Sequence, residues 1–185
     1  SATVSQKTKT SALQNNSGIN QSGNGNAANV SQNDDFQTSS VDQSSDGNTA
    51  TVTQGIDNSA DNSYGNISTV AQSGTGGNDA TVSQTGIFGI SAVSQVGSNG
   101  TANVTQHDAS QNQTSYVTQA GDADSATVDQ SGDTNLSSVD QQANSNAAVV
   151  KQNGNNNGSA VSQLADNNAA RVTQTGNGNS SGISQ

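Results

Sequence analysis

The chain has 185 residues and a formal net charge of −10, and it contains no Cys, Pro, Met or Trp. Only 27% of its residues are hydrophobic, which excludes an ordinary globular core and is typical of disordered chains unless stacked repeats build a thin core. The four basic residues form no stripe that would bind a nucleic acid, and no apolar run approaches the roughly 20 residues needed to cross a bilayer.

A Gln preceded two positions earlier by Val or Ile recurs along the whole chain. Its spacing is 11 residues throughout, apart from spacings of 15, 18, 12 and 13 that all lie before Gln119. In chain order, these glutamines are Gln6, Gln21, Gln32, Gln43, Gln54, Gln72, Gln84, Gln95, Gln106, Gln119, Gln130, Gln141, Gln152, Gln163, Gln174 and Gln185. Their apolar partners are Val4, Ile19, Val30, Val41, Val52, Val70, Val82, Val93, Val104, Val117, Val128, Val139, Val150, Val161, Val172 and Ile183.

Counting back from each Gln as position 0, position −4 alternates strictly between Ala and Ser, from Ala2 and Ser17 to Ala170 and Ser181. The true repeat is therefore 22 residues with two similar halves, and the chain holds eight repeats. Position −6 is usually Asn, and the asparagines predicted to join the core amides are Asn26, Asn48, Asn78, Asn146, Asn157, Asn168 and Asn179.

Alternation with a period of two over seven residues predicts a β-strand with one defined face. Gly often stands two residues after the Gln, where it would supply the positive φ of a sharp turn. Such a turn could close a hairpin or a β-arc, and the strict 22-residue alternation favours the arc, in which like strands stack on like. We therefore expect an all-β, cross-β solenoid of eight rungs, each with two facing strands.

In this solenoid, position −4 of one strand would face position −2 of the other, so Ala170 would face Ile183 and Val172 would face Ser181. Stacked Asn and Gln columns would form amide ladders that satisfy their buried polar groups. We expect a single domain over residues 1–185, with longer arcs at 7–14, 55–66 and 107–114 because the spacing is extended there.

The order of residues resembles the repeat of the curlin family. Residues 21–32 read Gln-Ser-Gly-Asn-Gly-Asn-Ala-Ala-Asn-Val-Ser-Gln, and residues 72–84 repeat this pattern with one residue added. The resemblance covers nearly the whole chain. It implies a secreted bacterial functional amyloid, a curli-like fibre of the biofilm matrix that serves adhesion. It also implies export through an outer-membrane pore, with any signal peptide removed, and seeding by a nucleator subunit.

No catalytic, metal or cofactor site is expected. His107 is the only His, the chain has no Cys, and neither a catalytic triad nor a zinc site can be assembled from these residues. The pairs Asp34–Asp35 and Asp122/Asp124 could be weak calcium ligands, but no twelve-residue calcium loop is present, and solvated turn residues are the favoured interpretation.

The strand order begins with an Ala-type strand and ends with a Ser-type strand, without a recognisable capping repeat. A second molecule stacked head to tail would continue the register, which predicts a homopolymeric fibre with no nucleic-acid partner and no membrane insertion. The predicted polymerisation ends are Ala2, Val4, Gln6, Ser17, Ile19, Gln21, Ala170, Val172, Gln174, Ser181, Ile183 and Gln185. The alternatives are a monomeric binding solenoid of the ice-binding type and a minor nucleator subunit of the same fibre.

Overall fold

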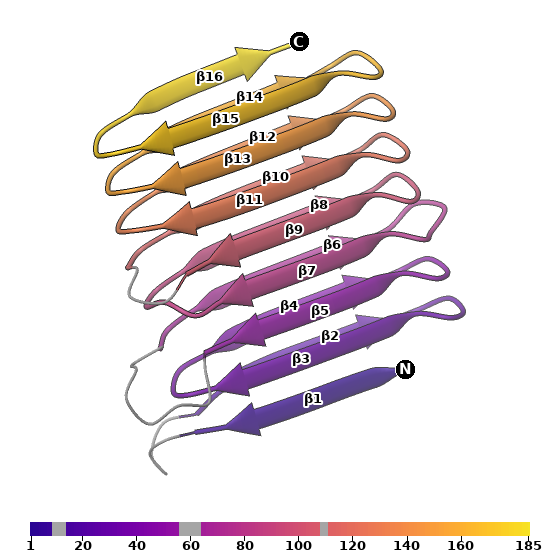
Figure 1. The fold of residues 1–185 in the computed structure, drawn as a ribbon. Coiled ribbons are helices and arrows are strands. Elements are labelled where there is room, and N and C mark those ends of the chain that lie inside the picture. The colour runs from indigo at the N-terminus through magenta and orange to yellow at the C-terminus, as the bar shows by residue number, and fades with distance from the viewer. Residues whose placement is uncertain (9–13, 56–63, 108–110) are drawn as a thin grey trace.

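The computed structural model describes residues 1–8, 14–55, 64–107 and 111–185, which form a two-sheet β-solenoid (Figure 1). Within this part of the chain every regular element is a strand, and no helix is long and apolar enough to span a membrane. The strands are β1 (Ala2–Lys7), β2 (Asn16–Gln21), β3 (Ala27–Asn33), β4 (Thr38–Gln43), β5 (Thr49–Gln54), β6 (Ile67–Gln72), β7 (Asp79–Gln84), β8 (Ile90–Gln95), β9 (Thr101–Gln106), β10 (Thr114–Gln119), β11 (Ser125–Ser131), β12 (Leu136–Gln141), β13 (Ala147–Asn153), β14 (Gly158–Gln163), β15 (Ala169–Thr175) and β16 (Ser180–Ser184).

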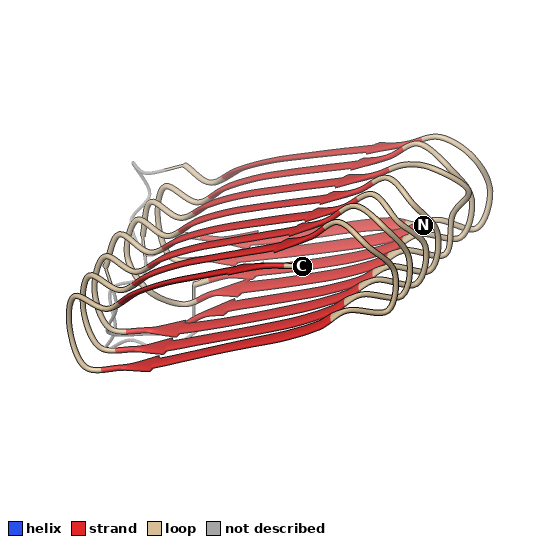
Figure 2. Cartoon of the chain, turned by 90° about the horizontal axis from the view of Figure 1, so that it is seen from above, coloured by secondary structure: helices blue, strands red, loops and turns tan. Residues whose placement is uncertain are grey.

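The odd-numbered strands form one parallel sheet of eight, the odd sheet, and the even-numbered strands form a second, the even sheet. Seen from above, the two sheets face each other and are joined by arcs at both sides (Figure 2). The predicted all-β solenoid of eight two-strand rungs is confirmed.

Every strand stacks on its neighbour with like residues paired. In the odd sheet Ala126 pairs with Ala148 and Val128 with Val150, and in the even sheet Gln119 pairs with Gln141. A parallel sheet requires a crossover between its neighbouring strands, and here the crossover is the facing strand of the other sheet. The 22-residue repeat is therefore one full turn of the solenoid.

The longer arcs lie only partly within the described structure. Lys7 closes β1 and Thr114 opens β10, so these two residues of the predicted arcs belong to strands. The segments 9–13, 56–63 and 108–110 of the same arcs lie outside the described residues.

From Gln32 onward, the residue seven positions before each Gln has a left-handed backbone conformation, and it is Gly or Asn in only some of the arcs. Ala123 and Thr134 adopt φ values of 58° and 59° there, although side chains with a Cβ disfavour this region. The glycines two positions after Gln do not all share one backbone conformation. Gly132 and Gly154 have positive φ as expected.

Gly97 and Gly121 correct that expectation, because neither has a positive φ. A Cβ on Gly97 would lie 1.9 Å from the carbonyl oxygen of Gly121, and one on Gly121 would lie 2.1 Å from that of Ala143. These glycines are required because the arc of the next rung approaches too closely for any side chain.

Candidate functional site: the stacked columns and the edges of the stack

The inward glutamines form two continuous side-chain ladders, one in each sheet. Away from the stack edges their side chains are fully buried. In each ladder the Nε2 of one Gln donates to the Oε1 of the next Gln towards the C-terminus, over 2.6 to 3.2 Å. Because every bond runs in the same direction, each ladder has a donor end and an acceptor end.

The same glutamines also bind the two sheets together. The Nε2 of Gln119 donates to the carbonyl oxygen of Thr101 over 3.0 Å, and that of Gln130 donates to the carbonyl oxygen of Thr114 over 2.9 Å. In both cases the acceptor is the residue at position −5 of the preceding strand, in the opposite sheet. Both protons of the amide are therefore used, which explains how a wide polar side chain is tolerated in the core.

The asparagines at position −6 bond differently from the predicted side-chain ladder. The Oδ1 of Asn26 accepts from the backbone N–H of Asn48 over 2.9 Å, and that of Asn135 accepts from the N–H of Asn157 over 3.0 Å. Their side-chain amides turn to the arcs, as where the Nδ2 of Asn157 donates to the carbonyl oxygen of Gly176 over 2.8 Å. Asn is one methylene shorter than Gln, so its side chain forms hydrogen bonds with nearby backbone groups.

At the end of the −6 column there is an amide-to-amide contact, in which the Nδ2 of Asn179 donates to the Oδ1 of Asn157 over 3.0 Å. Asn168 and Asn179 are half-buried. The other asparagines predicted for the core are buried, and they are Asn26, Asn48, Asn78, Asn146 and Asn157.

The apolar core consists of the −2 column in both sheets and the Ala column at −4 of the odd sheet. The Ser column at −4 of the even sheet is equally buried, but its hydroxyl oxygens have no hydrogen-bond partner within the described structure. These serines are Ser39, Ser68, Ser91, Ser115, Ser137 and Ser159.

A further column of polar bonds, which the sequence reasoning missed, runs along the arcs. The backbone N–H of Ser98 donates to the Oδ1 of Asp122, that of Asp122 to the Oδ1 of Asn144, and that of Asn144 to the Oδ1 of Asp166, each over 2.8 Å. The bonds from Ser98 hold the pKa of Asp122 below its usual value. The sequence signal that could have predicted this column is an Asn or Asp three residues after the Gln.

Asp124 stands in the −6 column where most repeats have Asn. Its Oδ1 accepts from the backbone N–H of Asn146 over 2.9 Å, while its Oδ2 is buried and has no partner among the described residues. Burial raises the pKa of Asp124 above its usual value. Asp122 and Asp124 therefore have pKa values shifted in opposite directions, although both were considered as calcium ligands.

The stack ends in four edge strands, β1 and β2 at one end and β15 and β16 at the other. Val4 on β1 is 47% exposed although it belongs to the inward −2 column, and Ala2 and Gln6 are exposed as well. On β2 and β16, Ser17, Ile19, Gln21, Ser181 and Ile183 are half-buried, and Gln185, directly after β16, is exposed. On β15 the predicted end residues Ala170, Val172 and Gln174 are buried.

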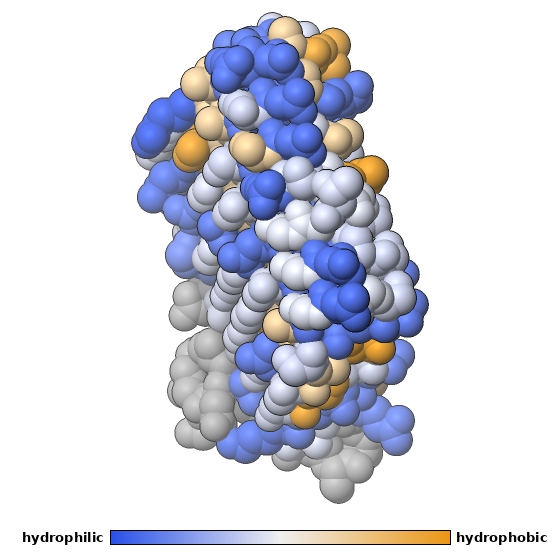
Figure 3. All heavy atoms as spheres, turned by 90° about the vertical axis from the view of Figure 1, so that its right-hand side faces the viewer, coloured by the Kyte–Doolittle hydropathy of each residue, from blue (hydrophilic) through white to orange (hydrophobic). Residues whose placement is uncertain are grey.

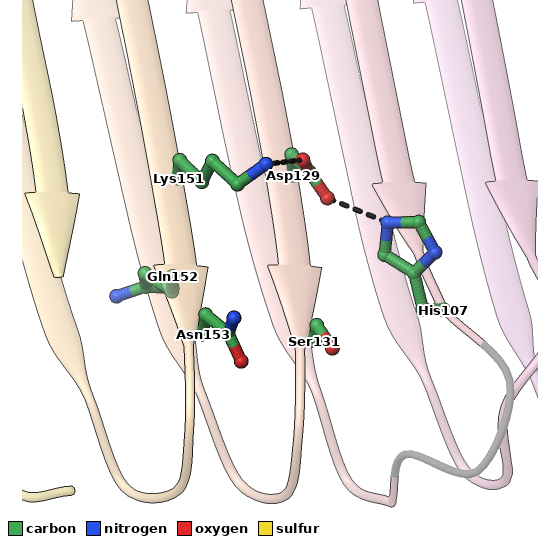
Figure 4. A pocket seen from close by; sticks show the side chains of 6 residues that line it. All are labelled: His107, Asp129, Ser131, Lys151, Gln152 and Asn153. Carbon is green, nitrogen blue, oxygen red and sulfur yellow. Dashed lines mark hydrogen bonds and ion pairs between the residues drawn. The ribbon is translucent and has the colours of Figure 1, made fainter. Parts of the chain in front are cut away.

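His107 lies at the outer side of the odd sheet in a shallow pocket of about 270 Å³ (Figure 4). Its Nε2 is 2.6 Å from the Oδ1 of Asp129, and the Nζ of Lys151 is 3.2 Å from the Oδ2 of the same carboxylate. These side chains stack at intervals of 22 residues and are partly exposed. The trio is a polar surface ladder, and its carboxylate is shared by the imidazole of His107 and the ammonium group of Lys151.

Within the described ranges, no three residues of the His, Cys, Asp or Glu type gather in a way that could hold a metal ion. The surface at one side of the solenoid is mostly hydrophilic and is interrupted by small hydrophobic patches (Figure 3). No protein-family model matches the chain, and no curated protein matches its sequence.

Proposed function

We propose that the chain is a structural subunit that assembles head to tail into a fibre, with β1 and β2 of one molecule stacked on β15 and β16 of the next. The observation that carries this proposal is that the edge strands at the two ends of the stack have matching residues at their inward positions. Ala2 and Gln6 would stack on Ala170 and Gln174 in the same register that every interior strand uses. The contact is heterologous and does not close, so it grows a filament.

The direction of the glutamine ladders supports a head-to-tail junction. The interior bonds run from Nε2 to Oε1 towards the C-terminus, so Gln174 and Gln185 would donate to the Oε1 atoms of Gln6 and Gln21 of the next molecule. In the single molecule, the Nε2 of Gln174 donates to the hydroxyl oxygen of Ser181 over 3.3 Å. A contact between two N-terminal ends would place acceptors against acceptors, and one between two C-terminal ends would place donors against donors, so the ladder favours one polarity of growth.

The resemblance to the curlin family extends the proposal to the biological setting. On that basis the fibre is extracellular, belongs to a biofilm matrix, promotes adhesion, and is seeded by a nucleator after export through an outer-membrane pore. A minor nucleator subunit of the same fibre is the alternative within this class. The fibre would be a functional amyloid, because its strands stack in register across the filament axis.

The monomeric ice-binding alternative requires a regular outer Thr face. On the odd sheet, outward Thr residues such as Thr51 and Thr81 give way to Asp129, Lys151 and Arg171 along the stack. These long charged side chains interrupt a flat Thr surface, so no observation favours this alternative.

The proposal is tested by seeded elongation of Val4→Lys. Val4 is 47% exposed in the single molecule, so a Lys there costs the monomer little, but it would be buried at the junction. We expect elongation to slow by at least about tenfold, since an unpaired buried charge costs several kcal/mol.

The matched control is Leu164→Lys, since Leu164 is 56% exposed in an arc. It should elongate at close to the wild-type rate. Equal rates for the two variants, or a wild-type protein that stays monomeric under seeding, would overturn the proposal. A 4.7–4.8 Å meridional reflection from the wild-type fibres is the expected diffraction signature.

A further inference from the structure

The outer face of the even sheet carries a ridge of large exposed side chains on four successive strands. Ile67, Ile90, Tyr116 and Leu136 project from β6, β8, β10 and β12 and are 44%, 39%, 47% and 48% exposed. Nothing in the described part of the molecule covers this ridge. Because these strands are neighbours in the sheet, the four side chains form one patch along the solenoid axis.

The remaining four strands of the same sheet carry small outward side chains. Their middle outward residues, at position −3, are Gly18 on β2, Ser40 on β4, Ala160 on β14 and Gly182 on β16. A shallow groove of about 480 Å³ already exists over β12, β14 and β16. In a head-to-tail fibre, β2 and β4 of the next molecule would follow β14 and β16, so that the ridge and the row of strands with small outward residues each span four strands.

The glycines of the groove are not required by the fold of the single molecule. A Cβ at Gly18, Gly158 or Gly182 would meet nothing within 4 Å, and none of the three has a positive φ. Glycine weakens a strand because it adds backbone freedom to the unfolded chain, and in strands it often marks the close approach of another chain. The described strands contain no other glycine, so this weakness is confined to the groove.

The geometry points to a second filament of the same chain as the occupant of this face, with the ridge of each filament seated in the groove of the other. This inference rests on the proposed head-to-tail fibre. The two filaments would be related by a twofold screw axis, with a translation of half a molecule, four strands or about 19 Å. Position −3 then faces position −3, so Tyr116 lies over Gly18, Ala92 over Gly182 and Thr69 over Ala160.

Without the half-molecule translation, Tyr116 would meet Tyr116 and the groove would meet itself, which leaves a void. With it, Tyr116 faces Gly18. Ile67 and Ile90, at position −5, face the small residues Ser162 and Ser184 at position −1. Leu136 faces Asp42. The stagger therefore follows from the division of the even sheet into two equal halves, four strands with large outward residues and four with small ones.

The like charges of the even sheet are kept apart in this pairing. Its strands carry two charged side chains, Asp42 and Asp140, both at position −1. In the staggered pair β4 lies over β12 and the strands run in opposite directions. The two carboxylates then stand at opposite ends of the strand pair, about 13 Å apart, beyond the Debye length of about 8 Å at physiological ionic strength.

The area available is adequate for a stable contact. Four strands of about 20 Å length spaced by about 4.8 Å cover about 400 Å², and each molecule contributes one ridge and one groove. The pairing would thus bury about 800 Å² per molecule, which is the size of a standard specific interface.

The test is the mass per unit length of fibres, measured by dark-field electron microscopy, together with the seeded elongation rate. In Tyr116→Asp the mass per unit length should fall by half, to that of a single filament, while elongation stays within about twofold of wild type. The matched control is Thr127→Asp, at position −3 of the neighbouring strand β11 but on the odd sheet. It should leave both quantities unchanged.

A rescue experiment assigns the facing pair. Tyr116→Lys and Gly18→Asp should each give single filaments, and the double variant should restore pairing, because the new charges attract. Within one molecule β10 and β2 are four strands apart in the sheet, so rescue reports a contact between filaments.

Three outcomes would overturn the lateral pairing alone: wild-type fibres that are single filaments, pairing that persists in Tyr116→Asp, or loss of pairing in Thr127→Asp. A wild-type protein that forms no filaments at all would overturn both the pairing and the proposed fibre, so the two failures are distinguishable.

Discussion

The two sheets of the solenoid share their inward columns and differ at position −4, which is Ala in the odd sheet and Ser in the even sheet. Ala126 and Ser115 lie on successive strands and are both fully buried. The methyl group of Ala126 belongs to the apolar core, whereas the hydroxyl of Ser115 finds no partner in the described structure. The glutamine columns beside them make the same bonds in both sheets.

This difference shows that the hydroxyl groups of the Ser column contribute no hydrogen bonds to the described interior of the stack. Within the described ranges, its hydroxyls accept hydrogen bonds only at the edges of the stack, where Gln6 donates to Ser17 over 3.4 Å and Gln174 donates to Ser181 over 3.3 Å. There each Gln lacks one of its interior partners. The Ser residues thus cost stability inside the stack and satisfy an amide where the stack is interrupted.

The largest effect on stability should come from a substitution in the glutamine column, which is present in both sheets. Gln119 accepts from Gln95 and donates to Gln141 and to Thr101 across the core. Gln119→Leu leaves these three groups unsatisfied, so we expect a loss of about 3–5 kcal/mol in the free energy of unfolding, measured by urea denaturation.

Two comparisons sharpen that result. Gln130→Leu, in the odd sheet, should cost the same, because Gln130 makes the equivalent bonds to Gln152 and Thr114. Gln142→Leu, at an exposed position in an arc, should change stability by no more than about 0.5 kcal/mol. A clearly smaller loss for one sheet would show that the ladders are unequal.

The repeat, the strands and the columns were predictable because each inward position recurs with a fixed residue type. Periodicity alone separates inward from outward positions in a strand, and the 22-residue alternation of Ala2 and Ser17 and their successors indicated that like stacks on like. The burial of Val and Gln follows directly from that register.

The bonding of the polar columns was not predictable to the same degree. Asn26 and Gln32 both read as members of an amide ladder, yet only Gln32 is long enough to reach both its stacking neighbour and the opposite sheet. Likewise, the left-handed backbone at Ala123 and Thr134 is imposed by the arc and has no signature in those residue types. Side-chain reach and arc geometry are three-dimensional properties that spacing does not encode.

An intermediate effect is expected at Asp124, which replaces Asn in the −6 column of the odd sheet. The raised pKa means that the folded state binds more protons than the unfolded state just above the ordinary Asp pKa, so stability falls as the pH rises through the folded pKa. Asp124→Asn removes this loss because it supplies an uncharged acceptor for the N–H of Asn146.

We therefore expect Asp124→Asn to be more stable than wild type by about 1–2 kcal/mol at neutral pH, with the advantage shrinking in acid. Urea unfolding at a series of pH values measures this. Asp122→Asn is the contrasting variant, since the pKa of Asp122 is lowered, and its deficit should be present at neutral pH and disappear as the pH falls. An Asp124→Asn advantage that does not depend on pH would contradict the electrostatic cause.

The smallest effect tests the Ala and Ser columns against each other directly. Ser115→Ala removes a buried hydroxyl without a partner, so the free energy of unfolding should rise by about 1 kcal/mol. Ala126→Ser adds such a hydroxyl to the odd sheet and should lower it by a similar amount. Ser181→Ala should bring no gain, because Ser181 accepts a hydrogen bond from Gln174 at the edge of the stack. A loss of stability in Ser115→Ala would mean that an internal water satisfies the hydroxyl, and the two sheets would then be equivalent in bonding as well as in shape.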